Sequence, residues 1–189
     1  MLEKRGWPVL YADRIAIELE ETRPSVRKAI KKLVGEDAYL GSGKLNKPFI
    51  ASRIFSRKTL QRAIERIVHP MVIGEISQRI KKYGKLGAPI VAVEAALLFE
   101  SGMRKHLDAV VVVSARENLR IRRVTKRDGV KPVDVRKRMK AQWPEEKKVR
   151  QADFVLGNNG TLKNLRTRVD LLMSLITALS QGSNHVNDL

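Results

Sequence analysis

The chain has 189 residues, of which 43% are hydrophobic, 5% aromatic and 31% charged, and its 38 Lys and Arg exceed its 20 Asp and Glu by 18. This composition is that of one folded unit and excludes a mainly disordered chain, while the absence of cysteine excludes disulfides, thiolate metal sites and thiol nucleophiles. No apolar run approaches the ~20 residues of a membrane span and no apolar stretch follows Met1, so we expect a cytoplasmic protein without membrane contact.

Short runs rich in Val, Ile and Leu alternate with longer amphipathic stretches, which predicts an α/β protein with a mainly parallel sheet. These runs show little polar alternation, so we expect interior strands covered on both faces. The expected strands are residues 8–12, 89–95, 107–114 and 153–156. The expected helices are residues 13–21, 24–34, 58–83, 116–127, 132–142, 145–152 and 161–180, followed by a frayed polar tail.

The helical block of residues 22–84 is too long for an ordinary crossover between two strands, which predicts an inserted subdomain. Within it, Gly41-Ser42-Gly43-Lys44 is similar to the end of a phosphate-binding loop. However, Ala38 stands where the first glycine belongs and Leu45 where Ser or Thr is needed. We therefore interpret this segment as an ordinary turn.

Three carboxylates lie near the predicted carboxyl ends of strands, the edge at which open α/β sheets bind ligands. Asp13 follows the first strand directly and is either a helix N-cap or a catalytic group, and residue type alone favours the cap. Glu94 lies near the end of the second strand, and Glu100 lies in the loop that follows it. Glu94 is the more notable of the two, because a carboxylate buried in a strand needs a partner.

Positive charge is concentrated in residues 116–150, where 14 Lys and Arg stand against 5 Asp and Glu, so half of the net charge lies there. Arg123 and Arg127 are four residues apart and share a helical face ahead of Asp128-Gly129, a turn signal. Such a face serves as a solvated surface, a phosphate clamp or a nucleic-acid patch. Asn158-Asn159-Gly160 follows the last strand as a turn, also at the ligand edge.

In their order and spacing these segments resemble the dephospho-coenzyme A (dephospho-CoA) kinases, P-loop kinases that complete coenzyme A (CoA) synthesis, over essentially the whole chain. The resemblance implies a P-loop kinase-like parallel sheet flanked by helices, with residues 22–84 as an acceptor-binding domain and residues 116–150 containing a lid. It rests on Pro8 through Asp13, Arg53-Ile54-Phe55, His69-Pro70, Leu97-Leu98-Phe99-Glu100, Arg123 and Arg127 with Asp128-Gly129, Ala141-Gln142, and Ala152-Asp153 running to Asn158-Asn159-Gly160.

The resemblance further implies ATP-dependent phosphorylation of the ribose 3′-hydroxyl of dephospho-CoA, with Mg²⁺ accompanying ATP and no metal ligand assigned to this chain. Asp13 would orient or deprotonate that hydroxyl, and Arg123 and Arg127 would contact the phosphates of ATP. Asn158, Asn159 and Gly160 would lie near the adenine. The acceptor side would be lined by Arg53, His69, Leu97, Leu98 and Glu100.

The sequence also departs from this family. Tyr11 stands where many members carry Asp and Ala96 where many carry Pro. Members begin with a strand, a glycine-rich P-loop and a helix ahead of the stretch corresponding to residues 6–13, so we expect a kinase that lacks its N-terminal part and is inactive alone. Without that normally central strand, we also expect unpaired strand edges near residues 89–95 and 107–114.

Two other interpretations stay open. One is a homologue that keeps the fold, binds CoA-like ligands and does not catalyse. The other is a basic nucleic-acid-binding protein, which is disfavoured because the charge outside residues 116–150 is spread evenly and no helix-turn-helix, RRM or zinc-finger pattern occurs.

Overall fold

The computed structural model describes residues 1–54 and 57–184. The chain divides into two compact units. We call Pro8–Ala96 the helical unit, and Met1–Trp7 together with Leu97–Leu189 the C-terminal unit.

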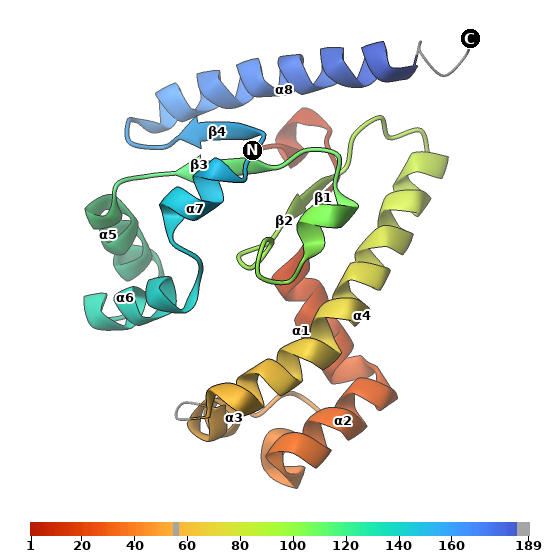
Figure 1. Ribbon diagram of the computed structural model, residues 1–189, viewed down its shortest axis with the longest axis vertical. Coiled ribbons are helices and arrows are strands. Elements are labelled where there is room, and N and C mark those ends of the chain that lie inside the picture. The colour runs from red at the N-terminus through yellow and green to blue at the C-terminus, as the bar shows by residue number, and fades with distance from the viewer. Residues whose placement is uncertain (55–56, 185–189) are drawn as a thin grey trace. The chain divides into compact units, whose positions relative to one another are not determined.

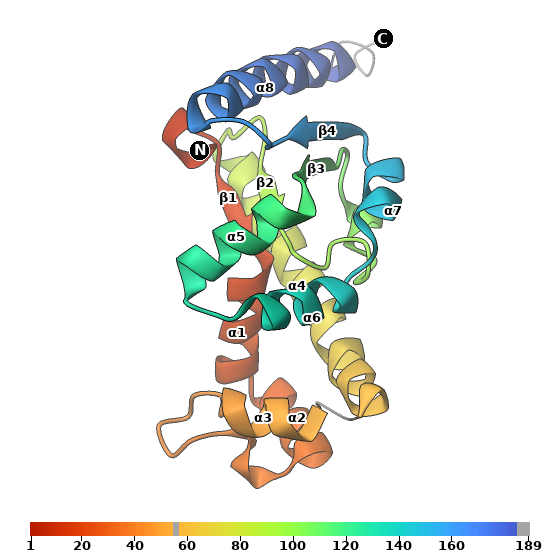
Figure 2. The ribbon, with the colours of Figure 1, turned by 90° about the vertical axis from the view of Figure 1, so that its left-hand side faces the viewer.

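The helical unit is built on two short parallel strands, β1 (Val9–Tyr11) and β2 (Ala92–Glu94). Their register pairs Val9 with Ala92 and Tyr11 with Glu94. Leu10 is 5% exposed and faces the core of the unit. β1 passes directly into α1 (Ala12–Thr22), as Figure 2 shows, so the end of the strand and the first turn of the helix lie at one place.

Three helices supply most of the core of the helical unit: α1, α2 (Pro24–Val34) and α4 (Lys58–Lys85). Their apolar side chains recur at helical spacing, which places them on one face of each helix, and α4 packs against both α1 and α2 (Figure 1). α4 continues through Pro70, and its two halves are inclined to each other. The buried residues of these three helices are Ala12, Ile15, Leu19, Val26, Ile30, Val34, Val68, Val72 and Ile76.

Two shorter elements complete the helical unit. The 3₁₀ turn η2 (Glu36–Ala38) and α3 (Lys47–Ile54) follow α2. The chain between them forms a tight turn, in which Tyr39 and Leu45 make an antiparallel bridge and the N–H of Gly43 donates to the carbonyl of Leu40 at 2.8 Å. Gly41-Ser42-Gly43-Lys44 is therefore an ordinary turn, as predicted.

The C-terminal unit contains a second parallel pair, β3 (Val111–Ser114) and β4 (Phe154–Gly157). Asp153 fixes the start of this pair, since its carboxylate accepts the N–H of Val110 at 2.7 Å and lies 3.0 Å from the guanidinium of Arg104. The other elements are η1 (Glu3–Arg5), η3 (Met103–His106), α5 (Glu117–Asp128), α6 (Pro132–Ala141), α7 (Glu145–Arg150) and α8 (Leu162–Asn184).

α8 packs along β4 through its apolar face, and both views show the two elements side by side (Figures 1 and 2). Val169 is buried in this helix. The N-terminal turn η1 is attached to the same helix, because the side chain of Arg5 donates to the carboxylate of Asp170. Through this bond the first residues of the chain join the C-terminal unit.

The predicted α/β class with parallel strands is confirmed. β1, β2 and β3 are shorter than the predicted strands, and β4 is as long as predicted but begins one residue later. The expectation of interior strands covered on both faces is wrong, because Val113 is 59% and Val155 51% exposed and no residue of β2 is buried. Each of the four described strands also pairs with only one neighbour, which agrees with the unpaired edges expected near residues 89–95 and 107–114. No helix among the described residues is long and apolar enough to span a membrane.

Candidate functional site

The carboxyl edge of β3 and β4 brings together three of the residues predicted to bind ATP. The N–H of Asn158 donates to the carbonyl of Ser114 at 2.7 Å, and this bond holds the turn after β4 beside the end of β3. Arg123 of α5 donates to the carbonyl of Asn158 at 2.7 Å. The side-chain oxygen of Asn159 accepts the backbone N–H of Arg116 at 2.8 Å. The start of α5 and the turn after β4 thus form one surface at the ligand edge.

Arg168 of α8 belongs to the same surface, and the sequence reading did not single it out. Its Nη1 donates to the carbonyl of Gly157 at 2.6 Å. A Cβ at Gly157 would lie 2.7 Å from that nitrogen, so glycine is what permits the approach. Gly160 packs against Asn164, one helical turn before Arg168. The four-residue spacing of Asn164 and Arg168 places both on one face of α8.

One arginine of α5 and one of α6 lie beside the same carboxylate, that of Asp128. Arg127 donates two hydrogen bonds to Asp128, at 2.6 and 3.1 Å. Arg138 of α6 lies 3.7 Å from the same carboxylate. The hydrogen bond from Arg127 is the main reason that the pKa of Asp128 lies below its ordinary value. Arg123 and Arg127 are exposed and lie one turn apart, as predicted.

Glu145, at the start of α7, ties this arginine-bearing region to the sheet. Its carboxylate accepts a hydrogen bond from the hydroxyl of Ser114 and lies 2.5 Å from the guanidinium of Arg120. Because Arg120 is one turn before Arg123, this ion pair fixes the base of α5. No role was predicted for Glu145 from the sequence.

The loop of residues 97–100 folds back on itself. The N–H of Ser101 donates to the carbonyl of Leu97 at 2.9 Å, and its hydroxyl to that of Leu98 at 3.2 Å. Leu97 and Leu98 are half-buried. Glu100 turns toward the segment between α6 and α7, where it accepts the N–H of Trp143 at 2.7 Å.

Asp13 lies at the carboxyl edge of the β1–β2 pair in the helical unit. It is the second residue of α1 and the N-cap position is Tyr11, so the interpretation of Asp13 as the N-cap is wrong. β1 enters the helix without a loop, and the helix therefore begins before Asp13. Its carboxylate is exposed and forms no hydrogen bond or ion pair with any residue that the structure describes. Glu94, in register with Tyr11, is exposed at the same edge.

Arg53 and His69 lie on different helices of the helical unit. Arg53 is exposed, with its guanidinium carbon 5.2 Å from the centre of the Phe49 ring. His69 is half-buried on α4, immediately before Pro70. In the described part of the chain, no hydrogen bond or ion pair joins these two side chains to each other or to Asp13. Phe55, which the resemblance includes, lies outside the described residues.

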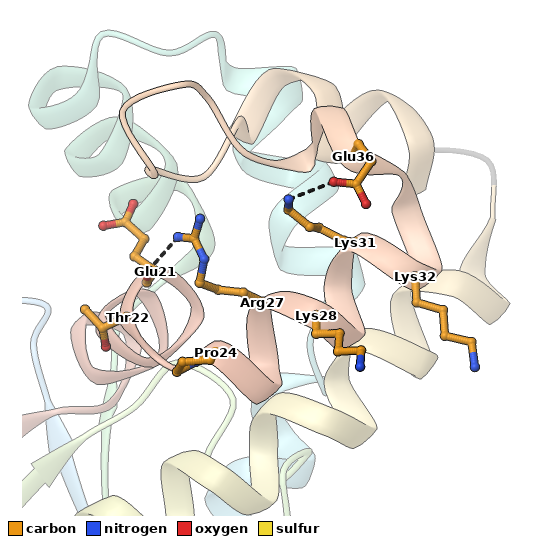
Figure 3. Close-up of a pocket in the computed structure, with 8 residues that line it drawn as sticks. All are labelled: Glu21, Thr22, Pro24, Arg27, Lys28, Lys31, Lys32 and Glu36. Carbon is orange, nitrogen blue, oxygen red and sulfur yellow. Dashed lines mark hydrogen bonds and ion pairs between the residues drawn. The ribbon is translucent and has the colours of Figure 1, made fainter.

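A basic hollow of about 660 Å³ opens beside α2 (Figure 3), and the sequence reading did not identify it. Arg27 is held by the carbonyls of Glu21 and Gly43, at 2.7 and 2.6 Å. Lys28 and Lys32 lie one turn apart, are exposed, and form no ion pair within residues 1–54 and 57–184. The hollow is lined by Glu21, Thr22, Pro24, Arg27, Lys28, Lys31, Lys32 and Glu36.

Known proteins with similar sequences and structures agree on one family. The family model described as dephospho-CoA kinase matches residues 1–164. The dephospho-CoA kinase of Chlorobaculum tepidum is 40% identical over 184 residues, covering 95% of this chain and 88% of the relative. That of Chlorobium luteolum is 37% identical over 187 residues, covering 96% and 85%.

Two solved structures support the fold. TT1252 from Thermus thermophilus superposes with a TM-score of 0.74 at 33% identity, covering 92% of this chain and 86% of the other. The dephospho-CoA kinase from Campylobacter jejuni gives 0.66 at 23% identity, covering 96% and 89%. The predicted P-loop kinase fold is thereby confirmed, and the chain belongs to the dephospho-CoA kinase family.

Proposed function

We propose that this protein transfers the γ-phosphoryl group of ATP to the ribose 3′-hydroxyl of dephospho-CoA, giving CoA. The observation that carries the proposal is the surface at the carboxyl edge of β3 and β4. There Arg123 contacts Asn158, and Arg127 and Arg138 stand nearby on α5 and α6. Phosphoryl transfer depends mainly on positioning and on neutralising charge, which clustered arginines supply.

On the ATP side, Arg123 and Arg127 would contact the phosphates, and Asn158, Asn159 and Gly160 would lie against the adenine. Arg127 can contact the phosphates even though it donates hydrogen bonds to Asp128 in this structure. An exposed ion pair is worth about 1 kcal/mol or less. A triphosphate carries several negative charges and forms stronger, charge-assisted hydrogen bonds with arginine, so it would displace Asp128. Residues 116–150 would then act as the lid.

On the acceptor side, we propose that residues 22–84 bind dephospho-CoA, with Arg53, His69, Leu97, Leu98 and Glu100 contributing to the acceptor wall. The basic hollow beside α2 supports this role, since dephospho-CoA carries a diphosphate. Lys28 and Lys32 present two ammonium groups on one helical face. Both have the charge and the freedom to bind phosphate oxygens.

Asp13 would orient the 3′-hydroxyl or accept its proton. As the oxygen–phosphorus bond to the ribose forms, the bond between the γ-phosphorus and its bridging oxygen breaks, and ADP leaves. The exposed carboxylate of Asp13 at a strand end suits this role, because a general base must reach the hydroxyl of a bound substrate.

The residues at this edge also fit Mg²⁺ that arrives with ATP. Carboxylate oxygens are ligands that Mg²⁺ accepts, and it is usually held by one or two of them together with substrate phosphates. Asp13 and Glu94 provide two such groups at the edge of β1 and β2. Among the described residues, no three His, Cys, Asp or Glu side chains form a metal-binding group. The metal would neutralise the phosphate charge.

We also propose that the phosphate-binding loop comes from outside these 189 residues. No segment of the sequence matches G-x4-G-K-[ST], and Gly41-Ser42-Gly43-Lys44 is a turn bridged by Tyr39 and Leu45. Such a loop supplies the backbone N–H cradle, the lysine and the Mg²⁺-binding hydroxyl. The chain alone is therefore expected to bind the acceptor without turnover.

Calorimetric titration of the folded chain with dephospho-CoA tests the acceptor side. Lys28→Gln combined with Lys32→Gln should weaken binding by about tenfold, because two exposed charge contacts are worth about 1 kcal/mol each at most. Lys81→Gln with Lys85→Gln is the matched control, since these exposed lysines have the same spacing on α4. Absence of heat with the folded chain would contradict acceptor binding.

A further inference from the structure

The carboxylate of Glu100 joins two segments that are 43 residues apart. Its side chain is 15% exposed, and its Oε1 accepts the backbone N–H of Trp143 at 2.7 Å. The ammonium of Lys148, itself 17% exposed, lies 3.6 Å from the same oxygen. A carboxylate so far removed from water needs such partners. Glu100 therefore holds the residues that connect α6 to α7.

The neighbouring residue strengthens this attachment. The rings of Phe99 and Trp143 stack with centroids 5.8 Å apart and planes 11° apart. The ammonium of Lys147 lies 3.3 Å from the centroid of the Trp143 ring. The loop of residues 97–100 thus holds Trp143 by its backbone and by its ring, which is more than a chance surface contact provides.

The held segment, residues 142–144, is the non-helical connection between α6 and α7, and we call it the hinge. On one side it continues α6, which carries Arg138, and on the other it enters α7. α7 is fixed to the sheet and to the base of α5 through Glu145. A movement of α6 relative to α7 would therefore turn about residues 142–144, the point that Glu100 holds.

We propose that Glu100 is a positioning residue that couples occupancy of the acceptor loop, residues 97–100, to the hinge of the lid. The inference rests on the proposed function, in which that loop forms part of the acceptor wall. A ligand pressing on the loop shifts Phe99 and Glu100, and Trp143 follows because both hold it. Acceptor binding thereby favours one position of the lid, and the lid already occupies that position when ATP binds.

Trp143 offers a direct probe, since the chain contains two tryptophans and Trp7→Phe leaves only this one. Without ligand, acrylamide quenching of Trp143 fluorescence should rise at least about twofold in Glu100→Ala, because the hinge is released. Glu100→Gln keeps an acceptor for the Trp143 N–H and should stay close to the parent. Glu146→Gln is the matched control, because Glu146 is an exposed carboxylate on α7, close to Trp143 in the sequence. Equal quenching in parent and Glu100→Ala would overturn the attachment.

Dephospho-CoA titrations, followed by fluorescence and by calorimetry, test the coupling. In the parent, the Trp143 emission should change with the same midpoint as the heat. In Glu100→Ala, dephospho-CoA should still release heat at saturation, with whatever loss of affinity the missing acceptor contact brings, while the emission change at saturation is lost. An emission change that survives in Glu100→Ala, or is missing from the parent despite heat, would overturn the coupling. Absence of heat when the Trp7→Phe protein is titrated would contradict the proposed function. The quenching experiment uses no ligand, so it tests the attachment of Trp143 independently of that function.

Discussion

Glu20 makes the stability of the helical unit depend on pH. Burial of this α1 residue, with Glu21 adding to the effect and Lys47 opposing it, raises its pKa from 4.5 to about 7. The folded chain keeps the proton that the unfolded chain loses near pH 4.5. Between these values the folded state binds more protons, so the free energy of unfolding falls as pH rises from about 4.5 to about 7.

The size of this effect follows from the same pKa. Each pKa unit is worth about 1.4 kcal/mol, and allowance for partial exposure reduces the full effect to about 2 kcal/mol. Glu20→Gln removes the ionisation. Relative to the wild type, the variant should therefore gain about 2 kcal/mol of stability between pH 5 and pH 8.

Urea unfolding at pH 5, 6, 7 and 8 measures this difference directly. Asp37→Asn is the control, because Asp37 is exposed in the same unit and should leave the pH dependence unchanged. A stability difference between wild type and Glu20→Gln that is the same at pH 5 and pH 8 would refute the reasoning.

The remaining predictions concern turnover and apply to a form of the protein that carries a phosphate-binding loop. Arg123→Ala and Arg127→Ala should each lower kcat by about 100-fold or more. Arg122→Ala, at an exposed neighbouring position on α5, is the control and should leave kcat unchanged. Unchanged rates in both Arg123→Ala and Arg127→Ala would show that these arginines form an ordinary solvated surface. Asp13→Asn should lower kcat with ATP binding retained, and since Asp13 is exposed, a loss of folding would contradict its assignment.

Parts of this fold could be predicted because local rules decide them. α2 begins and ends at the predicted residues, since Pro24 suits a first helical position and Val26, Ile30 and Val34 recur every four residues. α3 was missed because none of its residues is buried, so it has no apolar periodicity. The expected frayed tail after residue 180 is wrong as far as Asn184, because backbone hydrogen bonding extends α8 beyond its apolar pattern.

In the candidate site, too, the residues marked by local sequence rules were predicted, and those that depend on tertiary packing were not. Asp13, Arg123 and Asn158 were found because strand ends and helical spacing are visible in the sequence. The contacts of Glu100 with Trp143 and of Arg168 with Gly157 were missed. Glu100 and Trp143 are 43 residues apart, and no local pattern reports a hydrogen bond over that separation. Arg168 and Gly157 are 11 residues apart, and their contact depends on how the turn between β4 and α8 folds.

CoA formation from dephospho-CoA, ATP and Mg²⁺ is the most direct test of the central claim. It compares the 189-residue chain with a form preceded by roughly 20 residues that supply a strand, a phosphate-binding loop and the start of its helix. A thermal melt first confirms that both are folded. We expect CoA from the longer form and no turnover from the 189-residue chain. Equal rates from the two would contradict the need for an added loop, and no CoA from either would contradict the proposed reaction.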